Sequence, residues 1–409
     1  MSYLFGWDAI WGLFSTRICW GINMTPVSKS VLNTRLTEID WDFSGDHCAS
    51  SFSKVHWHPC RFVAQIPATL IGLLTDPGDT VLDPFCGSGT AIVEAQRLGR
   101  IATGIDINPV AGLVAKSKLH PVDGMTVAAA ASRWKRHTLK KIRLATLDAS
   151  EAMSAIPQGV QQNKWYSEST LRDLAVLWDA VRASRGEYAD IWRAAFSAIL
   201  LGACNEDRHW GYVCDNTQPK AVRRIDAVDL YMQAVDAYVA AYIDRDEFLG
   251  KGVEFPLPQA DVIQDDAADA MEKLCSNSID LVITSPPYFG VCDYIKAQRL
   301  SLEWFDMDIE EFRLREIGAR SKRHRKSAVS DYLFEMVRVF REVYRLLRGD
   351  GYLALIIGES SHRQSVVDEL TSVICDIGFE VLVEKERQVP VQRRQHPSLR
   401  EESVIIARK

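Results

Sequence analysis

Two short segments of this 409-residue chain combine residue types that could bind a small ligand and carry out chemistry on it. The first, DPFCGSGT at residues 83–90, joins an apolar stretch to a helical pattern. Such a loop can bring backbone N–H groups and a helix N-terminus close to an anionic group. Asp106 ends the next apolar stretch, where its carboxylate could accept hydrogen bonds from both hydroxyls of a ribose. Asp83 could accept hydrogen bonds from an ammonium group or position the loop through water. The alternative is a tight turn with a solvated aspartate.

The glycine spacing in this loop excludes two common phosphate-binding motifs. Dinucleotide-binding loops need GxGxxG, whereas Gly87 and Gly89 are followed by Ile92 at the third position. The loop also lacks the GK[ST] ending of a P-loop. We therefore expect a small ligand with a ribose and a carboxylate.

The second segment, TSPPY at residues 284–288, ends another apolar stretch. Two successive prolines remove two N–H donors and leave carbonyl oxygens free to accept hydrogen bonds. The hydroxyl of Ser285 before them and the ring of Tyr288 after them would form a slot for a flat, amino-bearing group. A strand that simply ends in prolines is the alternative. Open α/β sheets bind ligands at the carboxyl ends of their strands, which favours the functional interpretation.

The chain must fold so that strands and helices bring these segments together. From residue 76 onwards, strand candidates alternate with helical patterns, which predicts a doubly wound, mostly parallel α/β sheet. Helical patterns replace the strands between the second and third candidates, and tryptophans there at positions 134, 165, 178, 192 and 210 favour a helical core over base stacking. We expect an N-terminal extension at residues 1–50 and a cofactor-binding half at residues 51–120. A helical insertion at residues 121–258 is a candidate target-recognition region, and a catalytic half follows at residues 259–409.

Composition places the chain among globular proteins but reveals an uneven charge. Hydrophobic residues make up 47% and charged residues 25%. No apolar run is long enough to span a membrane, and the nine scattered cysteines lack a CxxC pair, which favours neither a disulfide framework nor a zinc site.

The net charge is −6, yet three segments are strongly basic. Residues 133–143 carry six Lys or Arg and no acid, residues 313–326 carry seven against one Glu, and residues 387–400 carry four and no acid. A polyanion could therefore meet a basic face.

The sequence resembles the S-adenosylmethionine-dependent amino-methyltransferases of DNA. The resemblance rests on DPFCGSGT, on GIDINP at residues 104–109 and on TSPPY, while residues 56–71 look like the segment that packs on the cofactor in this family. It implies a seven-stranded class I methyltransferase sheet with a helical insertion. The cofactor motif precedes the catalytic one, as in the alpha-type order of the family. Because the large insertion falls before the third strand, the position of the target-recognition region is left open.

The resemblance also implies roles for individual residues. The methyl donor S-adenosylmethionine would be bound by Asp83, Pro84, Phe85, Cys86, Gly87, Ser88, Gly89, Thr90, Asp106, Ile107, Asp265 and Asp266, of which one of the last two would meet the adenine. The catalytic residues would be Ser285, Pro286, Pro287 and Tyr288. Ser285 and the Pro286 carbonyl would hold the two hydrogens of an exocyclic amine. Tyr288 would stack on a base flipped out of the duplex.

The expected substrate is double-stranded DNA, and the expected product is N4-methylcytosine at a specific site. Cytosine-N4 enzymes of this family mostly carry Ser before the two prolines, as here at Ser285, whereas adenine-N6 enzymes mostly carry Asp or Asn. The alternatives are an adenine-N6 enzyme, an RNA enzyme and a binding subunit that has lost catalysis. The recognition sequence and a partner restriction system are left open.

Basic residues of the segments 313–326 and 387–400 are expected to contact DNA phosphates, namely Arg320, Lys322, Arg323, Arg325, Arg393 and Arg394. Pro59-Cys60 is the dipeptide that carbon-5 cytosine methyltransferases use as nucleophile, but here it precedes the cofactor loop instead of following it, which argues against that role. The histidines suggest no metal site. We expect a cytoplasmic protein, because the odd number of scattered cysteines fits a reducing compartment. The aromatic first 23 residues lack the features of an export signal; they form either an amphipathic helix or an over-extended reading frame before Met24.

Overall fold

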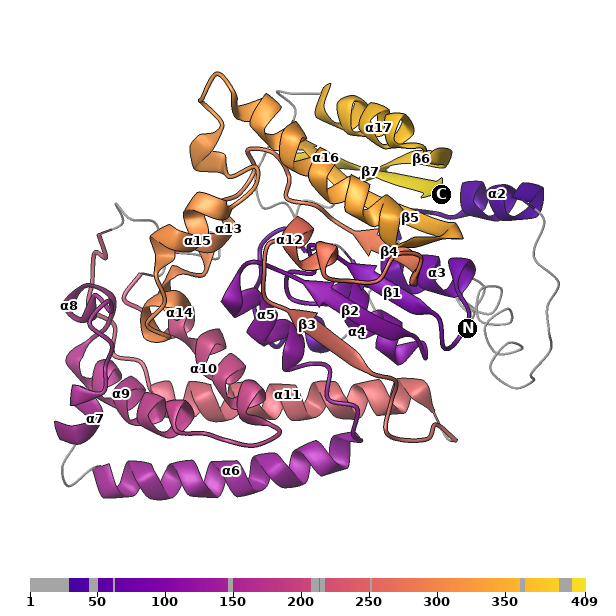
Figure 1. The fold of residues 1–409 in the computed structure, drawn as a ribbon. Helices are drawn as coiled ribbons and strands as arrows, with labels where there is room; N and C mark the ends of the chain where they lie inside the picture. Colours follow the sequence, from indigo (N-terminus) through magenta and orange to yellow (C-terminus); the bar gives the residue numbers. More distant parts are fainter. Residues whose placement is uncertain are drawn as a thin grey trace, which may run out of the picture.

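A seven-stranded sheet forms the centre of the molecule (Figure 1). The computed structural model describes residues 29–43, 51–61, 63–145, 150–206, 213, 218–250, 252–360, 365–389 and 399–409. The strand order is β3-β2-β1-β4-β5-β7-β6, and only β7 runs antiparallel to its neighbours. The strands are β1 Thr80–Asp83, β2 Ile101–Ile105, β3 Ala260–Ile263, β4 Ile279–Thr284, β5 Leu347–Ser360, β6 Glu380–Gln388 and β7 Leu399–Arg408. The predicted class I methyltransferase sheet is confirmed.

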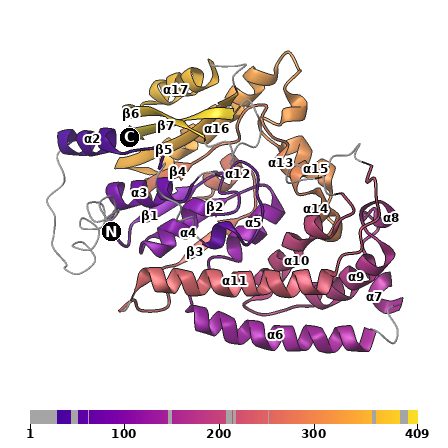
Figure 2. The ribbon, with the colours of Figure 1, turned by 180° about the vertical axis from the view of Figure 1, so that it is seen from behind.

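Helices cover both faces of the sheet, so side chains on both faces are buried. Successive residues of each strand point to opposite faces. Val81 and Leu281 pack with the helices of one face, whereas Leu82 and Val282 pack with those of the other. The first face is covered by α3 Gln65–Leu74, α4 Thr90–Arg97 and α5 Pro109–Lys116, which Figure 2 shows from behind. The second is covered by α12 Ala267–Glu272, α16 Ala328–Leu346 and α17 Ser365–Ile377. This double cover fixes the positions of the strand ends.

Between α5 and β3, the described residues form six helices in the region expected to be a helical insertion. They are α6 Gly124–Ala145, α7 Ser150–Ser154, α8 Gln162–Trp165, α9 Glu168–Arg182, α10 Ala189–Ala203 and α11 Ala227–Leu249. Trp165, Trp178 and Trp192 are buried, and Trp134 stacks on Trp192 with ring centroids 5.5 Å apart, so their predicted core role is confirmed. Trp210 lies outside the described residues.

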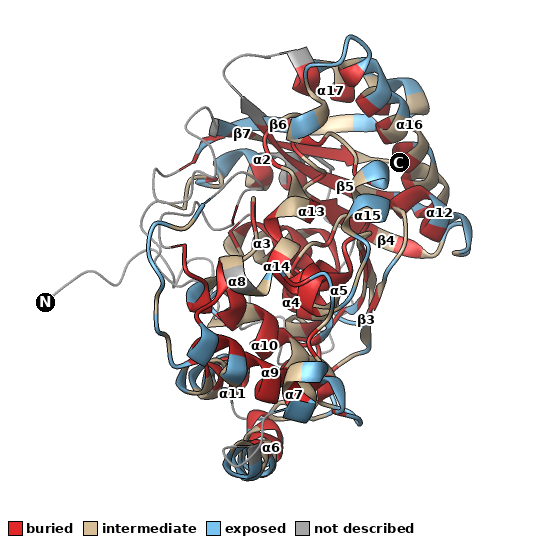
Figure 3. Cartoon of the chain, turned by 90° about the vertical axis from the view of Figure 1, so that its left-hand side faces the viewer, coloured by how far each residue is buried: buried red, intermediate tan, exposed pale blue. Residues whose placement is uncertain are grey.

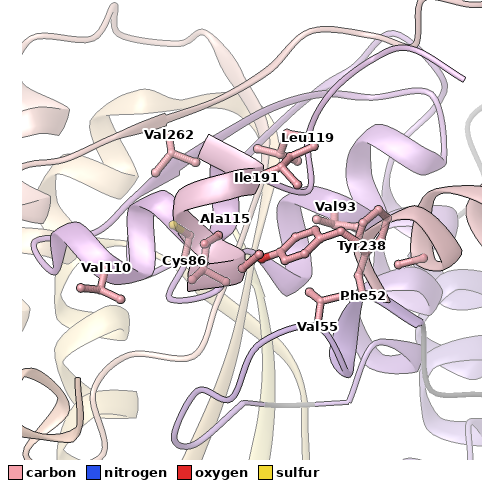
Figure 4. Packing of buried hydrophobic residues seen from close by; sticks show 14 of the residues in the cluster. Phe52, Val55, Cys86, Val93, Val110, Ala115, Leu119, Ile191, Tyr238 and Val262 are labelled. Atoms are coloured by element: carbon pink, nitrogen blue, oxygen red, sulfur yellow. The ribbon is translucent and has the colours of Figure 1, made fainter. Parts of the chain in front are cut away.

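The insertion is packed against the cofactor-binding half of the sheet. Tyr238 of α11 reaches toward residues of α4 and α5 (Figure 4), and Ser117 Oγ donates a hydrogen bond to its hydroxyl over 3.0 Å. Figure 3 shows that α6 forms the outermost layer, with one side buried and the other exposed. A role of these helices in target recognition stays a prediction.

The remaining elements flank the sheet. After β4 the chain forms α13 Tyr294–Ala297, α14 Arg299–Trp304, α15 Ile309–Arg315 and η2 Arg320–Lys322, and before the sheet it forms α2 Lys29–Glu38 and η1 Ser51–Ser53. Among the helices of the described ranges, none is long and apolar enough to cross a membrane.

Candidate active site

The two predicted motifs meet at one edge of the sheet, because β1, β2 and β4 are parallel and end on the same side. Asp83 is the last residue of β1, Asp106 directly follows β2, and Thr284 ends β4. A cavity of about 870 Å³, including the part that opens to solvent, lies at this edge. Of the predicted site residues, it is lined by Pro84, Phe85, Cys86, Gly87, Ser88, Thr90, Asp106, Ile107, Asp266, Ser285 and Pro287.

The glycine loop is held in a backbone shape that side chains would disturb. Gly87 and Gly89 have φ values of 50° and 84°, and a Cβ atom at Gly89 would lie 2.9 Å from the Cβ of Ala115. The Gly87 N–H donates to Asp106 Oδ2 over 2.8 Å, and the Gly89 N–H donates to the Cys86 carbonyl over 2.7 Å. These two N–H groups therefore shape the loop itself, whereas the sequence had suggested that they face a ligand.

Asp106 is held firmly and still has capacity to accept hydrogen bonds. Its Oδ1 accepts the Asn108 N–H over 2.8 Å, and its Oδ2 accepts the Gly87 N–H. Each carboxylate oxygen can accept a second hydrogen bond, and the residue lines the cavity. Burial raises the pKa of Asp106 to about 6, against the opposing effect of the two N–H donors. This geometry fits a ligand with two neighbouring hydroxyls.

Asp83 carries a buried carboxylate oxygen without a partner among the described residues. Its Oδ1 accepts hydrogen bonds from Thr284 Oγ1 over 2.6 Å and from the Phe85 N–H over 3.1 Å, whereas Oδ2 has none. Burial, with a smaller contribution from the charge of Asp106, raises the pKa of Asp83 to about 7. A buried acid with an unused oxygen fits a cationic group, and the contact with Thr284 ties β1 to the catalytic strand.

The segment before the glycine loop supplies residues that the sequence analysis did not assign. His58 and Arg61 line the cavity, and a Cβ atom at Gly87 would come within 3.0 Å of the His58 ring. Burial lowers the pKa of His58 to about 3, so its ring is neutral at pH 7. Lys118 Nζ donates to the Ser88 carbonyl over 2.7 Å and supports the loop from behind. The resemblance of residues 56–71 pointed to the segment of His58 and Arg61 but not to these two side chains, and no sequence signal singled out Lys118, which follows α5.

The structure separates the two acids that were considered for the adenine. Asp265 Oδ2 pairs with Lys273 Nζ at 2.7 Å and Asp265 does not line the cavity. Asp266 lines it, and its side chain caps α12 by accepting the Ala268 N–H over 3.0 Å. Asp266 is therefore the acid at the cavity.

In the described part of the chain, no cluster of three or more His, Cys, Asp or Glu residues could hold a metal ion.

The catalytic segment differs from expectation at its aromatic residue. Ser285 is half-buried and lines the cavity, and Pro286 is buried beside it. Only 1% of Tyr288 is exposed, so in this structure its ring cannot stack on a base. The ring packs with Val291 and Cys60, and Cys60 itself lines the cavity even though it precedes the glycine loop in sequence.

The basic loop at residues 313–326 is attached to the chain that follows TSPPY. The Gly290 N–H donates to the Gly318 carbonyl over 2.8 Å, and the backbone N–H and hydroxyl of Ser321 donate to Asp293 Oδ1 over 2.9 and 2.7 Å. This attachment places the predicted DNA-contacting loop beside the cavity. Glu316, which the sequence analysis did not single out, is buried at the cavity wall, and burial raises its pKa to about 7.

The predicted phosphate-binding residues do not share one environment. Lys322 Nζ turns back to donate to the carbonyls of Leu314 and Glu316 over 3.0 and 2.8 Å. Arg325 is exposed, whereas Arg320 and Arg323 are partly buried. Two further residues of the prediction, Arg393 and Arg394, lie outside the described residues.

The sheet order and the cavity at its carboxyl edge define a class I methyltransferase. The sequence profile of the DNA methylase family that comprises N6 and N4 enzymes matches residues 19–116 and 279–409, and the chain belongs to this family. The residues present fit its methyl donor, S-adenosylmethionine: Asp106 can accept from ribose hydroxyls, and the unpartnered oxygen of Asp83 can accept from an ammonium group.

Known relatives carry type II methyltransferase names. The chain is 22% identical to the type II methyltransferase M.MvaI of Kocuria varians over 274 residues, which cover 63% of this chain and 58% of that protein. It is 21% identical to M.MjaII of Methanocaldococcus jannaschii over 419 residues, covering 82% and 78%. Among solved structures, the rRNA methyltransferase aviRa of Streptomyces viridochromogenes aligns with a TM-score of 0.36 and 11% identity, covering 90% of this chain and 94% of that one.

Proposed function

We propose that this protein transfers a methyl group from S-adenosylmethionine to N4 of cytosine at specific sites in double-stranded DNA. The observation that carries the proposal is that Ser285 lines the same cavity as Asp106 and the glycine loop. A donor bound at Asp106 and an amine bound at Ser285 would thus share one enclosed space, and such positioning accounts for a large part of catalysis in transfer reactions.

The protein would make an exocyclic amine, which is a poor nucleophile, reactive by holding the two hydrogens of the amine. The lone pair of an exocyclic amine is conjugated with the base, so the nitrogen must become pyramidal before it can attack. Ser285 Oγ and the Pro286 carbonyl would accept the two amine hydrogens and favour that shape. When bound, S-adenosylmethionine supplies a methyl group whose bonding electron pair remains on the sulfur. The methylated nitrogen then loses one proton to water.

The target base must leave the duplex to reach the cavity, since the amine of a paired base lies inside the duplex. The basic loop at residues 313–326 would hold the flanking phosphates beside the cavity opening. Adenine-N6 is the alternative target because its amine has similar geometry, and Ser285 before the two prolines is what favours cytosine. A partner restriction enzyme is consistent with the type II names of the relatives.

The proposal is tested by incubating the purified protein with DNA and methyl-labelled S-adenosylmethionine, followed by digestion to nucleosides and mass spectrometry. We expect labelled N4-methylcytosine. Label on adenine alone would replace cytosine by the alternative target. Label at carbon 5 of cytosine would instead implicate the thiol of Cys60, and label on RNA but not on DNA would overturn the substrate class.

A further inference from the structure

A buried chain of hydrogen bonds leads from Ser285 to the last strand of the sheet. Ser285 Oγ donates to the Tyr288 hydroxyl over 3.0 Å, and the Tyr288 hydroxyl donates to Glu402 Oε1 over 3.0 Å. Arg387 donates to the other oxygen of Glu402. Tyr288, Glu402 and Arg387 are 1%, 7% and 3% exposed, so water has little access to this chain.

Elementary hydrogen-bond chemistry fixes the direction of this chain. Glu402 forms an ion pair with the guanidinium of Arg387, and the carboxylate of an ion pair can only accept hydrogen bonds. The single hydrogen of Tyr288 must therefore point at Glu402, which leaves only lone pairs on the phenol oxygen for Ser285. Burial, and after it the carboxylate of Glu402, raises the pKa of Tyr288 well above its ordinary value, so the phenol keeps this hydrogen.

We propose that Glu402 is a positioning residue that, through Tyr288, turns the Ser285 hydroxyl hydrogen away from the cavity. Ser285 then presents only oxygen lone pairs to the incoming amine and must accept its hydrogen. A serine without this arrangement is free to rotate and to donate instead, which would orient an amine wrongly. The inference rests on the proposed function, in which Ser285 accepts an amine hydrogen.

The sheet register places the partners without any local sequence signal. Glu402 on β7 is directly opposite Arg387 on β6 and Gly358 on β5. The Arg387 Nε–H also donates to the Trp41 carbonyl over 2.9 Å, which anchors the segment after α2 to the same pair. The arrangement gives the antiparallel edge of the sheet a role in the site, although none of the predicted site residues lies on the described part of β6 or β7.

The test compares Glu402→Gln, Tyr288→Phe and the double variant in steady-state methyl transfer to DNA. An amide at position 402 can donate to Tyr288 and reverse the chain, and a phenylalanine at position 288 cuts it. Each single variant should lower kcat roughly 10- to 100-fold while KM for DNA and for S-adenosylmethionine changes less than about twofold. Because both changes break one chain, the double variant should be no slower than the slower single variant.

The matched control is Glu401→Gln, the same change at the neighbouring position of β7. Glu401 is exposed and accepts a hydrogen bond from Gln388 Nε2 over 3.0 Å, away from the chain that leads to Ser285, so we expect wild-type kcat. The proposal is overturned if Glu402→Gln behaves like Glu401→Gln. It is also overturned if the losses of the two single variants multiply in the double variant, because independent structural damage would act in that way.

Thermal melting and calorimetric titration with S-adenosylmethionine show whether each variant is folded. If Glu402→Gln does not fold, Tyr288→Phe decides alone, because it keeps the Glu402–Arg387 pair: a loss confined to kcat supports the proposal, and wild-type kcat overturns it. A wild-type protein that methylates no DNA would refute the proposed function, whereas an active wild type with unaffected variants would refute only the role of Glu402.

Discussion

The two ends of the cavity are built in different ways. At the cofactor end, Asp106 is held by the N–H groups of Gly87 and Asn108, which lie 19 and two positions away in the chain. At the catalytic end, Ser285 is oriented through Tyr288 by Glu402, which lies 114 positions beyond Tyr288 on an antiparallel strand. The position of Asp106 is thus set by one local β-α-β unit, whereas the orientation of Ser285 depends on the antiparallel edge of the sheet.

This difference predicts separable defects. Changes at the cofactor end should weaken S-adenosylmethionine binding and lower turnover as a consequence. Changes at the catalytic end should leave the cofactor bound and lower turnover directly. The predictions below test that separation.

Ser285→Ala should have the largest effect on the reaction. It removes the proposed acceptor for an amine hydrogen, and the loss of one such group typically lowers kcat about 100- to 1000-fold. Single-turnover transfer of labelled methyl groups measures the rate, and calorimetry should give an unchanged affinity for S-adenosylmethionine. Ser330→Ala, at an exposed position of α16, is the control. A fall in cofactor affinity that matches the fall in rate would break the separation.

Asp106→Ala should weaken cofactor binding most strongly. The change removes charge-assisted hydrogen bonds to the ribose hydroxyls at a cost of roughly 2–4 kcal/mol, which corresponds to about 30- to 900-fold in the dissociation constant. Calorimetry measures this constant, and Asp261→Ala, at an exposed position of β3, is the matched control. An unchanged dissociation constant in Asp106→Ala would contradict the assignment of the ribose site.

Cofactor affinity should depend on pH because both acids at this end have raised pKa values. Ribose hydroxyls and an ammonium group favour the ionised carboxylates, so protonation opposes binding. Affinity should fall below about pH 7, the pKa of Asp83, by up to about tenfold per pH unit. Below about pH 6, the pKa of Asp106, protonation of the second acid should add a further factor of about ten for each pH unit. Asp106→Asn should remove the steeper part. An affinity that is constant between pH 5 and 8 would count against both assignments.

The basic loop should show the smallest effects, and they should differ between neighbouring residues. Arg325→Ala should reduce the slope of log affinity for DNA against log salt by up to about 0.9, because the exposed Arg325 side chain can contact a phosphate. Lys322→Ala should change the slope less, because its ammonium group already donates to two carbonyls. Equal slopes for both variants and the wild type would mean that the loop does not contact DNA phosphates.

The sheet and the contact between Asp106 and the glycine loop could be predicted from the sequence because their signals are local. A loop, a helix and an acid after the next strand follow one another within residues 83–106, so their spacing alone predicts Asp106 beside Gly87. Burial was harder to predict: Tyr288 was expected to be open to a base and is covered instead. No spacing rule connects Ser285 with Glu402, since their contact arises from the register of β5, β6 and β7.

The most direct test of the central claim is the base composition of DNA from cells that express the protein. DNA from cells with the wild type and from cells with Ser285→Ala would be digested to nucleosides and analysed by mass spectrometry. We expect N4-methylcytosine with the wild type and none above background with the variant. Unmodified DNA from cells that contain folded wild-type protein, or the same modified base with Ser285→Ala, would contradict the account.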